Sequence, residues 1–457
     1  MSAIYIMKGT ISVFTLAITA AAFAGQNDVS LKCGVAETVI TRVKDRQEVY
    51  GELNARALVF AAANQRAALV TLDIGTLGND YAKDLLKGIS NATGIPAENL
   101  LINPSHTHNA PGVDGRNMSP ESRTWLAGVL AELVASAAGH LEPTTLRYGR
   151  APVQVGFNRR LMVDGHVTME PNRQGAVVPW VDVLAVHGLK GKRIAVLFSH
   201  AAHPVIVHRS SGTTGPDYPG FAVTHLRRLL STKDGEAVGI FMFAQGCGAN
   251  INGYPLNGGL DKCETAGLSL ATAVVQALAN AKEIASGSPT VRSTTLSLPL
   301  QNPPPLAECK ANLANQPDNQ RYQGLLKLVE SGQPQFKPLP VRALAIGDLC
   351  IVGFAGEMFA EYQLWLDQAS PFKHTFALSY TNGYAGYIGT ADDYKLGPAG
   401  GYETWEFPTG NPPWLPLRPA AETQVRDGVL KLLTGLKSQA TSRDGRPLSD
   451  QPEPATK

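Results

Sequence analysis

The feature that most limits what this chain can fold into is the alternation of two hydrophobic patterns along it. Short apolar runs rich in β-branched residues, such as 67–74 and 181–186, alternate with longer runs in which apolar residues recur at helical spacing, such as 80–90 and 119–141. The short runs are typical of buried strands and the longer ones of amphipathic helices. Because strands that alternate with helices form layered domains, we predict an α/β fold of mixed β-sheets layered with helices.

The same patterns predict further elements. Asn64-Gln65 separates the apolar runs 57–62 and 67–74, which indicates a hairpin. Ser119 followed by Pro120 is typical of a helix start, because Ser caps the helix and Pro fits its first position. We also expect strands over 193–198, 238–243 and 342–354, and helices over 221–230, 262–281 and 306–330.

Length and charge narrow the class of protein. The 457 residues would suffice for two or three domains, but no repeat and no linker divides them, so we expect one domain over 25–437. The 40 Lys plus Arg nearly balance the 38 Asp plus Glu, so composition gives no reason to expect binding to nucleic acid or to an anionic membrane. The sequence leaves the oligomeric state open.

The first 24 residues have the pattern of an export signal. Lys8 supplies a positive charge, residues 11–23 form an apolar run that is short for a bilayer span, and Ala22-Phe23-Ala24 is a small-x-small cleavage pattern. We therefore predict cleavage before Gly25 and a mature protein in the periplasm or outside the cell, without a transmembrane segment. An uncleaved anchor is the alternative. The polar residues 438–457 are expected to form a disordered tail.

An exported protein can keep disulfide bonds, so the cysteines matter. The chain has five of them: Cys33, Cys247, Cys263, Cys309 and Cys350. An odd number leaves at least one free or in an intermolecular bond, and the sequence does not determine which of the others pair.

Two histidines in the segment 103–112 have the clearest capacity for chemistry. His106 and His108 follow a short apolar run at 99–102 that is typical of a buried strand, and the turn-forming residues around them let the chain bend so that both rings face one side. Imidazole is the commonest neutral metal ligand and titrates near neutral pH, so the pair could supply a ligand and a general base. Two solvated or hydrogen-bonded loop histidines would show the same short pattern.

Two further candidates follow predicted strands. His203 comes after the strand at 193–198, at the end of a strand where α/β sheets place their ligands, although a packed core histidine has the same pattern. Glu357 comes after the strand at 342–354 and a Gly-rich turn, which can project a carboxylate into a cleft. The alternative for Glu357 is a helix-capping role.

Aromatic and basic residues provide the remaining candidates. Small residues separate Tyr384 from Tyr387, and Tyr402 lies downstream. This spacing allows either close approach of a ligand or aromatic packing. Arg159 could hold an oxyanion or a carboxylate, since its planar guanidinium matches such groups.

These motifs together resemble those of the neutral/alkaline non-lysosomal ceramidases. Ser-His-Thr-His-Asn-Ala-Pro at 105–111 resembles the family's Thr-His-Thr-His-Ser-x-Pro, and His203-Pro204 resembles its second histidine site. Gly356-Glu357 resembles its Pro-Gly-Glu turn. The segment from Tyr384 to Tyr394 resembles its Tyr-x-x-Tyr and Glu-Glu-Tyr run. Asn158-Arg159 and the Ala-Arg-Ala of 55–57 also have counterparts, and the order along the chain is the family's.

The resemblance runs from about Cys33 to about Leu436 and implies a zinc site. By motif position the zinc ligands would be His106, His203, Glu357 and Tyr387. Two imidazoles and a carboxylate form a recognised catalytic zinc set, in which zinc activates water for attack on an amide or ester carbonyl.

The resemblance also implies roles for other residues. His108 would be the acid/base residue beside the metal, and Arg159 and Tyr402 would polarise the scissile carbonyl. Two departures stand out. Asn252 occupies the place of a family serine, with Asn250 at the place of an aspartate, and no run of predicted strands remains for the family's C-terminal immunoglobulin-like domain. The segment 397–401 also indicates an altered pocket rim.

We therefore predict an exported zinc-dependent hydrolase similar to the neutral ceramidases, which cleaves an amide or ester bond of a small-molecule or lipid substrate. Asn252 is expected among its catalytic residues, with His108, Arg159 and Tyr402. One alternative is a hydrolase of a small polar amide, ester or lactone unrelated to ceramide. A non-catalytic binding protein that keeps the fold is another. His108 argues against the binding protein, because it has no ligand role to explain it.

Overall fold

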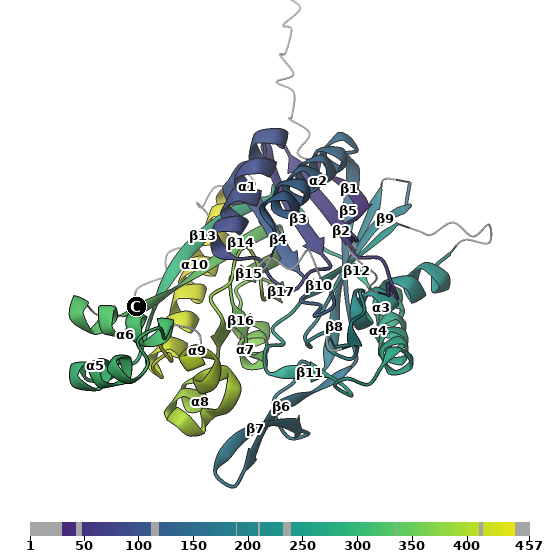
Figure 1. Cartoon of the computed structure of the whole chain (residues 1–457). Coiled ribbons are helices and arrows are strands. Elements are labelled where there is room, and N and C mark those ends of the chain that lie inside the picture. The colour runs from purple at the N-terminus through teal and green to yellow at the C-terminus, as the bar shows by residue number, and fades with distance from the viewer. Residues whose placement is uncertain are drawn as a thin grey trace, which may run out of the picture.

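The structure, a computed structural model, describes residues 30–42, 48–110, 118–188, 190–208, 211–231, 239–333, 335–410 and 415–443. The predicted export signal and residues 444–457 lie outside these ranges. No helix within them is both long and apolar enough to cross a membrane. The predicted α/β class, with mixed sheets layered against helices, is confirmed (Figure 1).

Nine strands form the largest sheet. They are β1 Lys32–Val39, β2 Asn54–Ala62, β3 Gln65–Leu72, β4 Leu100–Pro104, β5 Glu142–Pro152, β8 Trp180–Gly188, β9 Arg193–His200, β10 Ile240–Gln245 and β12 Lys282–Glu283. Their order is β10-β9-β8-β5-β1-β2-β3-β4, with β12 beside β5. The β2–β3 hairpin turns at the predicted place, with Ala62 opposite Gln65. Most neighbours are antiparallel, whereas β3 with β4 and β9 with β10 are parallel.

Three smaller sheets complete the strands. A four-stranded sheet has the order β13-β14-β15-β17, a three-stranded sheet β11-β6-β7, and β16 pairs with β18. The bounds are β6 Gly156–Val163, β7 His166–Asn172, β11 Ile251–Gly253, β13 Thr290–Pro299, β14 Phe336–Ile346, β15 Leu349–Phe354, β16 Glu357–Met358, β17 His374–Leu378 and β18 Tyr387–Ile388. The β6–β7 hairpin projects from the body of the molecule (Figure 1).

The helices form the two outer layers. They are α1 Asn79–Thr93, α2 Pro120–Gly139, α3 Asp217–Leu229, α4 Leu260–Ala279, α5 Leu306–Asn315, α6 Gln320–Ser331, α7 Ala360–Ala369, α8 Ala391–Lys395, α9 Phe407–Gly410 and α10 Ala420–Arg443. The side chain of Ser119 caps α2 as predicted, accepting a hydrogen bond from the backbone N–H of Ser122.

Four clusters of apolar side chains show how the helices and sheets pack on one another. One cluster packs α1 and α2 on β1 to β4, and a second packs α3 and α4 on β8 to β10. The opposite face of the large sheet packs against the four-stranded sheet, with Leu58 and Leu184 in one cluster with Leu344 and Ile351. The far side of the four-stranded sheet packs against α7 and α10. The period-2 alternation of strands explains this arrangement, since successive side chains of one strand face different layers.

Three predicted boundaries were wrong. The helix expected over 306–330 is two helices, α5 and α6, because Pro317 interrupts it and the Asn319 side chain caps the second. The strand expected over 342–354 is a hairpin of β14 and β15, and Gly347 takes the left-handed conformation of its turn (φ 59°). Helix α10 continues to Arg443, so the first six residues of the expected tail are helical. All five cysteines are buried and unpaired.

Strand ends from both halves of the chain meet at one place. The Asn103 side chain, near the end of β4, accepts a hydrogen bond from the Gln245 N–H at the end of β10 and donates to the Ser379 carbonyl just after β17. The segments that follow β4, β9, β10, β15 and β17 therefore come together. These segments carry most of the candidate site residues.

Candidate functional site

His106 and His108 lie where β4 gives way to a loop. His106 adopts a left-handed backbone (φ 67°), a conformation uncommon for residues other than Gly, and this supplies the bend that the motif needs. Its Nδ1 lies 2.8 Å from the Gly75 carbonyl oxygen, and its Nε2 lies 3.3 Å from His108 Nε2. Both rings therefore reach the same side of the chain. His106 is 3% exposed, whereas His108 is half-buried.

His203 follows β9 and is buried. Its Nδ1 lies 2.8 Å from the Gly248 carbonyl oxygen, so Nδ1 carries the proton and Nε2 presents a lone pair. Burial, reinforced by the charge of Arg159, lowers the pKa of His203, which keeps this imidazole neutral. Nε2 is buried and makes no hydrogen bond to any residue that the structure describes.

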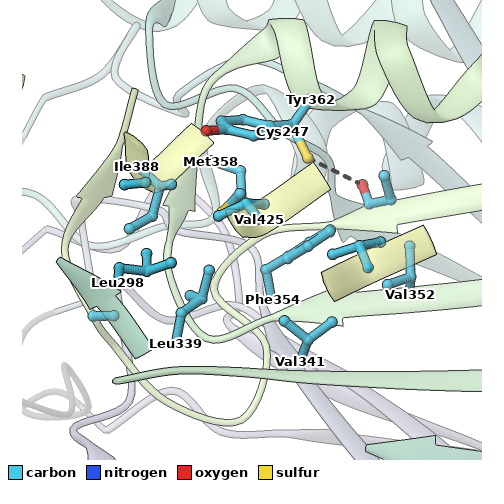
Figure 2. Packing of buried hydrophobic residues seen from close by; sticks show 14 of the residues in the cluster. Cys247, Leu298, Leu339, Val341, Val352, Phe354, Met358, Tyr362, Ile388 and Val425 are labelled. Atoms are coloured by element: carbon cyan, nitrogen blue, oxygen red, sulfur yellow. Dashed lines mark hydrogen bonds between the residues drawn. The ribbon is translucent and has the colours of Figure 1, made fainter. Parts of the chain in front are cut away.

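Glu357 is the first residue of β16, directly after the turn that follows β15. Phe354 and Met358, on either side of the turn, pack into one apolar cluster with Ile388 of β18, which anchors the backbone (Figure 2). The Tyr380 hydroxyl donates to Oε2 at 3.1 Å, and the Tyr384 hydroxyl donates to Oε1 at 2.5 Å. No side chain caps the start of α7, the helix that follows, so the helix-capping alternative for Glu357 is not observed.

The charge of Glu357 is set by its neighbours. Burial raises the pKa of the Glu357 carboxyl, but the positive charge that His106 and His203 carry when protonated and the hydrogen bond from the Tyr384 hydroxyl outweigh burial and lower it to about 2. The side chain is therefore a carboxylate at neutral pH, although it is only 2% exposed. A buried carboxylate requires a cation or strong donors beside it.

The two imidazoles converge on one oxygen of this carboxylate. His106 Nε2 lies 3.6 Å and His203 Nε2 lies 3.4 Å from Glu357 Oε2. In each ring the other nitrogen faces a backbone carbonyl, which is the usual way in which a metal-binding histidine is oriented. Lone pairs that face a carboxylate oxygen repel it unless a cation lies between them. The geometry and the donor set therefore fit a divalent metal ion.

His108 is close enough to take part in such a centre. The ligand nitrogens of His106, His108 and His203 all lie within 4.8 Å of one another, so this group of three could itself hold a metal ion. His108 also neighbours another histidine, since its ring centroid is 5.5 Å from that of His208. The geometry alone thus permits His108 as a ligand or as a residue beside the metal.

Tyr387 lies beside Glu357, because the two residues are partners across the parallel strands β16 and β18. Its hydroxyl oxygen accepts a hydrogen bond of 3.1 Å from Arg159 Nη2. Burial and the charge of Glu357 raise the pKa of the Tyr387 hydroxyl well above its usual value, although Arg159 lowers it, so the phenol keeps its proton when no cation is bound. The predicted fourth ligand is therefore next to Glu357, one of the other three.

Arg159 links the metal side of the site to two polar partners. Its Nε donates to Glu403 at 2.7 Å, and its Nη1 donates to the Asn252 Oδ1 atom at 2.9 Å. Glu403 also binds Arg160, which in turn pairs with Asp393. Burial raises the pKa of Glu403, but Arg159 and Arg160 lower it to a net value below the usual range. Two arginines and two carboxylates thus balance one another in charge.

The remaining predicted residues lie around this core. Asn252 is in β11, whose backbone adjoins His203. Asn250 has a structural role, since its side chain accepts from the Ala360 N–H at the start of α7 and donates to Glu361. The Tyr402 ring, 37% exposed, lies 5.8 Å from the Tyr387 ring. Every residue that the sequence nominated for the site is thus brought into one region.

Sequence reasoning missed Tyr380, Glu403 and His208. Tyr380 stacks on the His106 ring at 4.1 Å between centroids as well as binding Glu357. A signal existed for Glu403: two adjacent arginines at 159–160 that enter a buried site need a carboxylate nearby. No comparable signal marks Tyr380, whose position depends on the long-range pairing of β15 with β17.

Two solved structures have the same fold. A crystal structure of neutral ceramidase from Pseudomonas aeruginosa superposes with a TM-score of 0.67 at 17% sequence identity, covering 90% of this chain and 75% of that chain. A ceramidase complexed with C2 superposes with a TM-score of 0.68 at 16% identity, covering 90% of this chain and 76% of that one. No family model and no curated protein sequence matches the chain. The predicted ceramidase-like fold is therefore confirmed.

Proposed function

We propose that this protein is an exported zinc-dependent hydrolase that cleaves an amide or ester bond with zinc-activated water. The observation that carries this proposal is the convergence of His106 Nε2 and His203 Nε2 on the Glu357 carboxylate, with the second nitrogen of each ring turned to a backbone carbonyl. The fold shared with two ceramidases adds support for acyl transfer to water. At this level of identity it does so only by analogy.

In this proposal His106, His203, Glu357 and Tyr387 hold the zinc ion. When bound, zinc supplies a Lewis acid and activates water for attack on the carbonyl. Tyr380 and Tyr384 orient the Glu357 carboxylate by donating to its two oxygens. Partners of this kind fix the ligand geometry and tune the metal.

The acid–base role belongs to His108. It is half-buried and its Nε2 is 3.3 Å from His106 Nε2, so it borders the metal position while its ring stays open to substrate. A neutral imidazole there can accept the proton of the attacking water and pass it to the leaving nitrogen or oxygen. In this proposal Tyr402 at the exposed rim and Arg159 beside Tyr387 polarise the carbonyl oxygen of the substrate.

A non-catalytic metal-binding protein is the competing function, and one observation favours it. His108 completes a three-histidine group with His106 and His203, which gives it a ligand role without any chemistry. Metal content separates the two functions: loss of zinc on substitution of His108 supports the three-histidine site, whereas retention of zinc with loss of turnover supports the hydrolase.

Export is part of the proposal and rests on residues 1–24 of the sequence. Expression of the full chain in a bacterial host and mass spectrometry of the periplasmic or secreted protein test it. An N-terminus at Gly25 is expected. An intact Met1 in the membrane fraction would show an uncleaved anchor.

The hydrolase is tested by combining metal analysis with a substrate panel. Purified protein is stripped with a chelator, reloaded with zinc, and assayed on amides, esters and lactones of graded size. Activity that depends on reloading supports the proposal. Stoichiometric zinc without turnover of any substrate would favour the non-catalytic metal-binding protein.

A further inference from the structure

A cavity of about 250 Å³ lies beside the candidate functional site and is lined by two of its residues that are not predicted metal ligands. Arg159 and Asn252 form one end of it. Its walls come from the β6–β7 hairpin and from the segment 253–256, and they are mainly apolar, including Phe157 and Leu256. An apolar cavity with a few convergent polar groups is the usual form of a small-molecule site.

The polar end of the cavity presents a hydrogen-bond donor. A guanidinium has only donors, so the contact with Arg159 Nη1 at 2.9 Å must use the Asn252 Oδ1 atom. The Asn252 amide nitrogen is thereby turned away from Arg159, and it makes no hydrogen bond to a residue in the described ranges. Because Asn252 is only half-buried and lines the cavity, this nitrogen is available to a ligand.

The charges around this end favour a neutral acceptor. Arg159 is matched by Glu403, and its neighbour Arg160 is matched by Glu403 and Asp393. The exposed Glu170 adds negative charge to the cavity lining. Among the residues that line the cavity Arg159 is the only cation, since Arg173 stacks on the Phe157 ring but does not line the cavity. The lining therefore offers no uncompensated positive charge to repay the desolvation of a ligand carboxylate, whereas a hydroxyl or carbonyl oxygen needs only a donor.

The volume limits the size of the group that enters. A cavity of about 150 Å³ holds benzene, so 250 Å³ corresponds to roughly six to ten non-hydrogen atoms. Position matters as well: the one guanidinium of Arg159 touches both Tyr387 and Asn252. A group in the cavity is therefore only a few bonds from a carbonyl held at the metal.

We infer that Asn252 sets the substrate specificity of the site. The cavity takes a compact, mainly apolar acyl group of about six to ten non-hydrogen atoms, and the Asn252 amide nitrogen donates to a neutral oxygen near the scissile carbonyl. This inference rests on the proposed hydrolase. It excludes long-chain ceramide as an efficient substrate.

The test uses zinc-loaded full-length mature protein and four anilides that share one leaving group: hexanoyl, 3-hydroxyhexanoyl, adipoyl and hexadecanoyl. We expect kcat/KM to be about tenfold higher for 3-hydroxyhexanoyl than for hexanoyl, from one added hydrogen bond. The anionic adipoyl and the long hexadecanoyl anilides should both be poorer than hexanoyl. Equal rates for hexanoyl and 3-hydroxyhexanoyl, or efficient cleavage of the hexadecanoyl anilide, would overturn the inference.

Two variants test the Asn252 hydrogen-bond donor and the cavity volume separately. Asn252→Asp keeps the size and still accepts from Arg159 but cannot donate at neutral pH, so the preference for the 3-hydroxy group should fall to within about twofold, while chain-length preference persists. Leu256→Ala enlarges the cavity and should extend the accepted chain while the 3-hydroxy preference stays. A 3-hydroxy preference retained in Asn252→Asp would show that Asn252 is not the donor.

A binding measurement distinguishes failure of this inference from failure of the proposed function. Titration of hexanamide and 3-hydroxyhexanamide into wild-type and Asn252→Asp protein does not require turnover. One possible result is that the hydroxy amide binds more tightly to wild type only and that no anilide is hydrolysed. This result would support Asn252 as the specificity residue and contradict the proposed hydrolase. Equal binding of the two amides to wild type would contradict the inference that Asn252 sets the specificity.

Discussion

The Nε2 atom of His203 lies 3.4 Å from the Oε2 atom of Glu357, and no proton is available to join them. The ring proton is on Nδ1, where it faces the Gly248 carbonyl, and both oxygens of the buried carboxyl accept hydrogen bonds from tyrosine hydroxyls, as an ionised carboxyl does. A lone pair and a carboxylate held this close need a cation between them. This pair of residues is therefore the part of the site most sensitive to metal.

One zinc ion per chain is the first prediction. Elemental analysis of the purified protein should give a ratio near one, and His203→Ala should weaken zinc binding by about tenfold or more, because one of a few ligands is lost. His140→Ala, at an exposed position after α2, is the matched control and should bind zinc like wild type. Absence of metal after reconstitution with zinc would contradict the assignment.

The second prediction concerns the hydroxyl that orients Glu357. Tyr384→Phe removes the 2.5 Å hydrogen bond to Oε1, so zinc affinity should fall by about tenfold to a hundredfold. Tyr362→Phe is the control, since Tyr362 is a buried residue of the apolar cluster (Figure 2). Its hydroxyl donates to the Gly389 carbonyl and not to Glu357. Competition with a chromophoric chelator measures both. Equal zinc affinities in the two variants would show that Tyr384 only packs.

Local patterns were enough to predict part of this site. His106, His203 and Glu357 each follow an apolar run, and the hydrophobic pattern alone places them at strand ends. Local patterns could not predict the pairing of Arg159 with Glu403, because the two residues are 244 positions apart. Their contact depends on how the β6–β7 hairpin meets the segment after α8, which no short-range pattern specifies.

Burial explains which elements the sequence revealed. The strands β2, β3, β9 and β10 are buried along most of their length and were predicted as apolar runs. The strand β7 has no buried residue, and in β13 buried and exposed residues alternate only weakly. Hydrophobic residues therefore do not recur at a regular spacing in these two sequences, and neither strand was predicted. The boundaries of α5 and α6 were missed for a different reason, since the break at 316–319 is set by turn residues within one helical pattern.

The third prediction is a pH dependence of stability that arises from His200. This buried side chain has its Nδ1 2.9 Å from the Trp180 carbonyl, and burial lowers its pKa from 6.5 to about 4. The unfolded chain therefore binds more protons than the folded one between pH 6.5 and 4, so stability should fall as the pH drops through this window, by up to about 3 kcal/mol. Urea unfolding at pH 7 and pH 4.5 measures the change.

The variant His200→Gln isolates this contribution. It cannot titrate, so its stability should change less than that of wild type between pH 7 and 4.5. The comparison is needed because burial raises the pKa of Asp217 to about 6, which acts with the opposite sign: protons bound to folded Asp217 stabilise the protein as the pH falls. An equal pH dependence in wild type and His200→Gln would assign the effect to other groups.

The last prediction separates a hydrolase from a metal-binding protein through His108. General acid–base assistance is typically worth about a hundredfold to ten-thousandfold in rate. His108→Ala should therefore keep its zinc but lose at least about a hundredfold in turnover on the best substrate of the panel. Backbone carbonyls hold the rings of His106 and His203, so removal of the His108 ring should leave both ligands in place.

Zinc content and turnover are measured on the same samples of His108→Ala, because the two readouts together decide the role. Full activity with zinc retained would remove the acid–base role. Loss of zinc together with activity would instead make His108 a ligand in the group with His106 and His203, and Tyr387 would then be the residue to test as surplus. Tyr387→Phe with zinc retained in that case would complete the three-histidine assignment, since its hydroxyl would have served only Arg159.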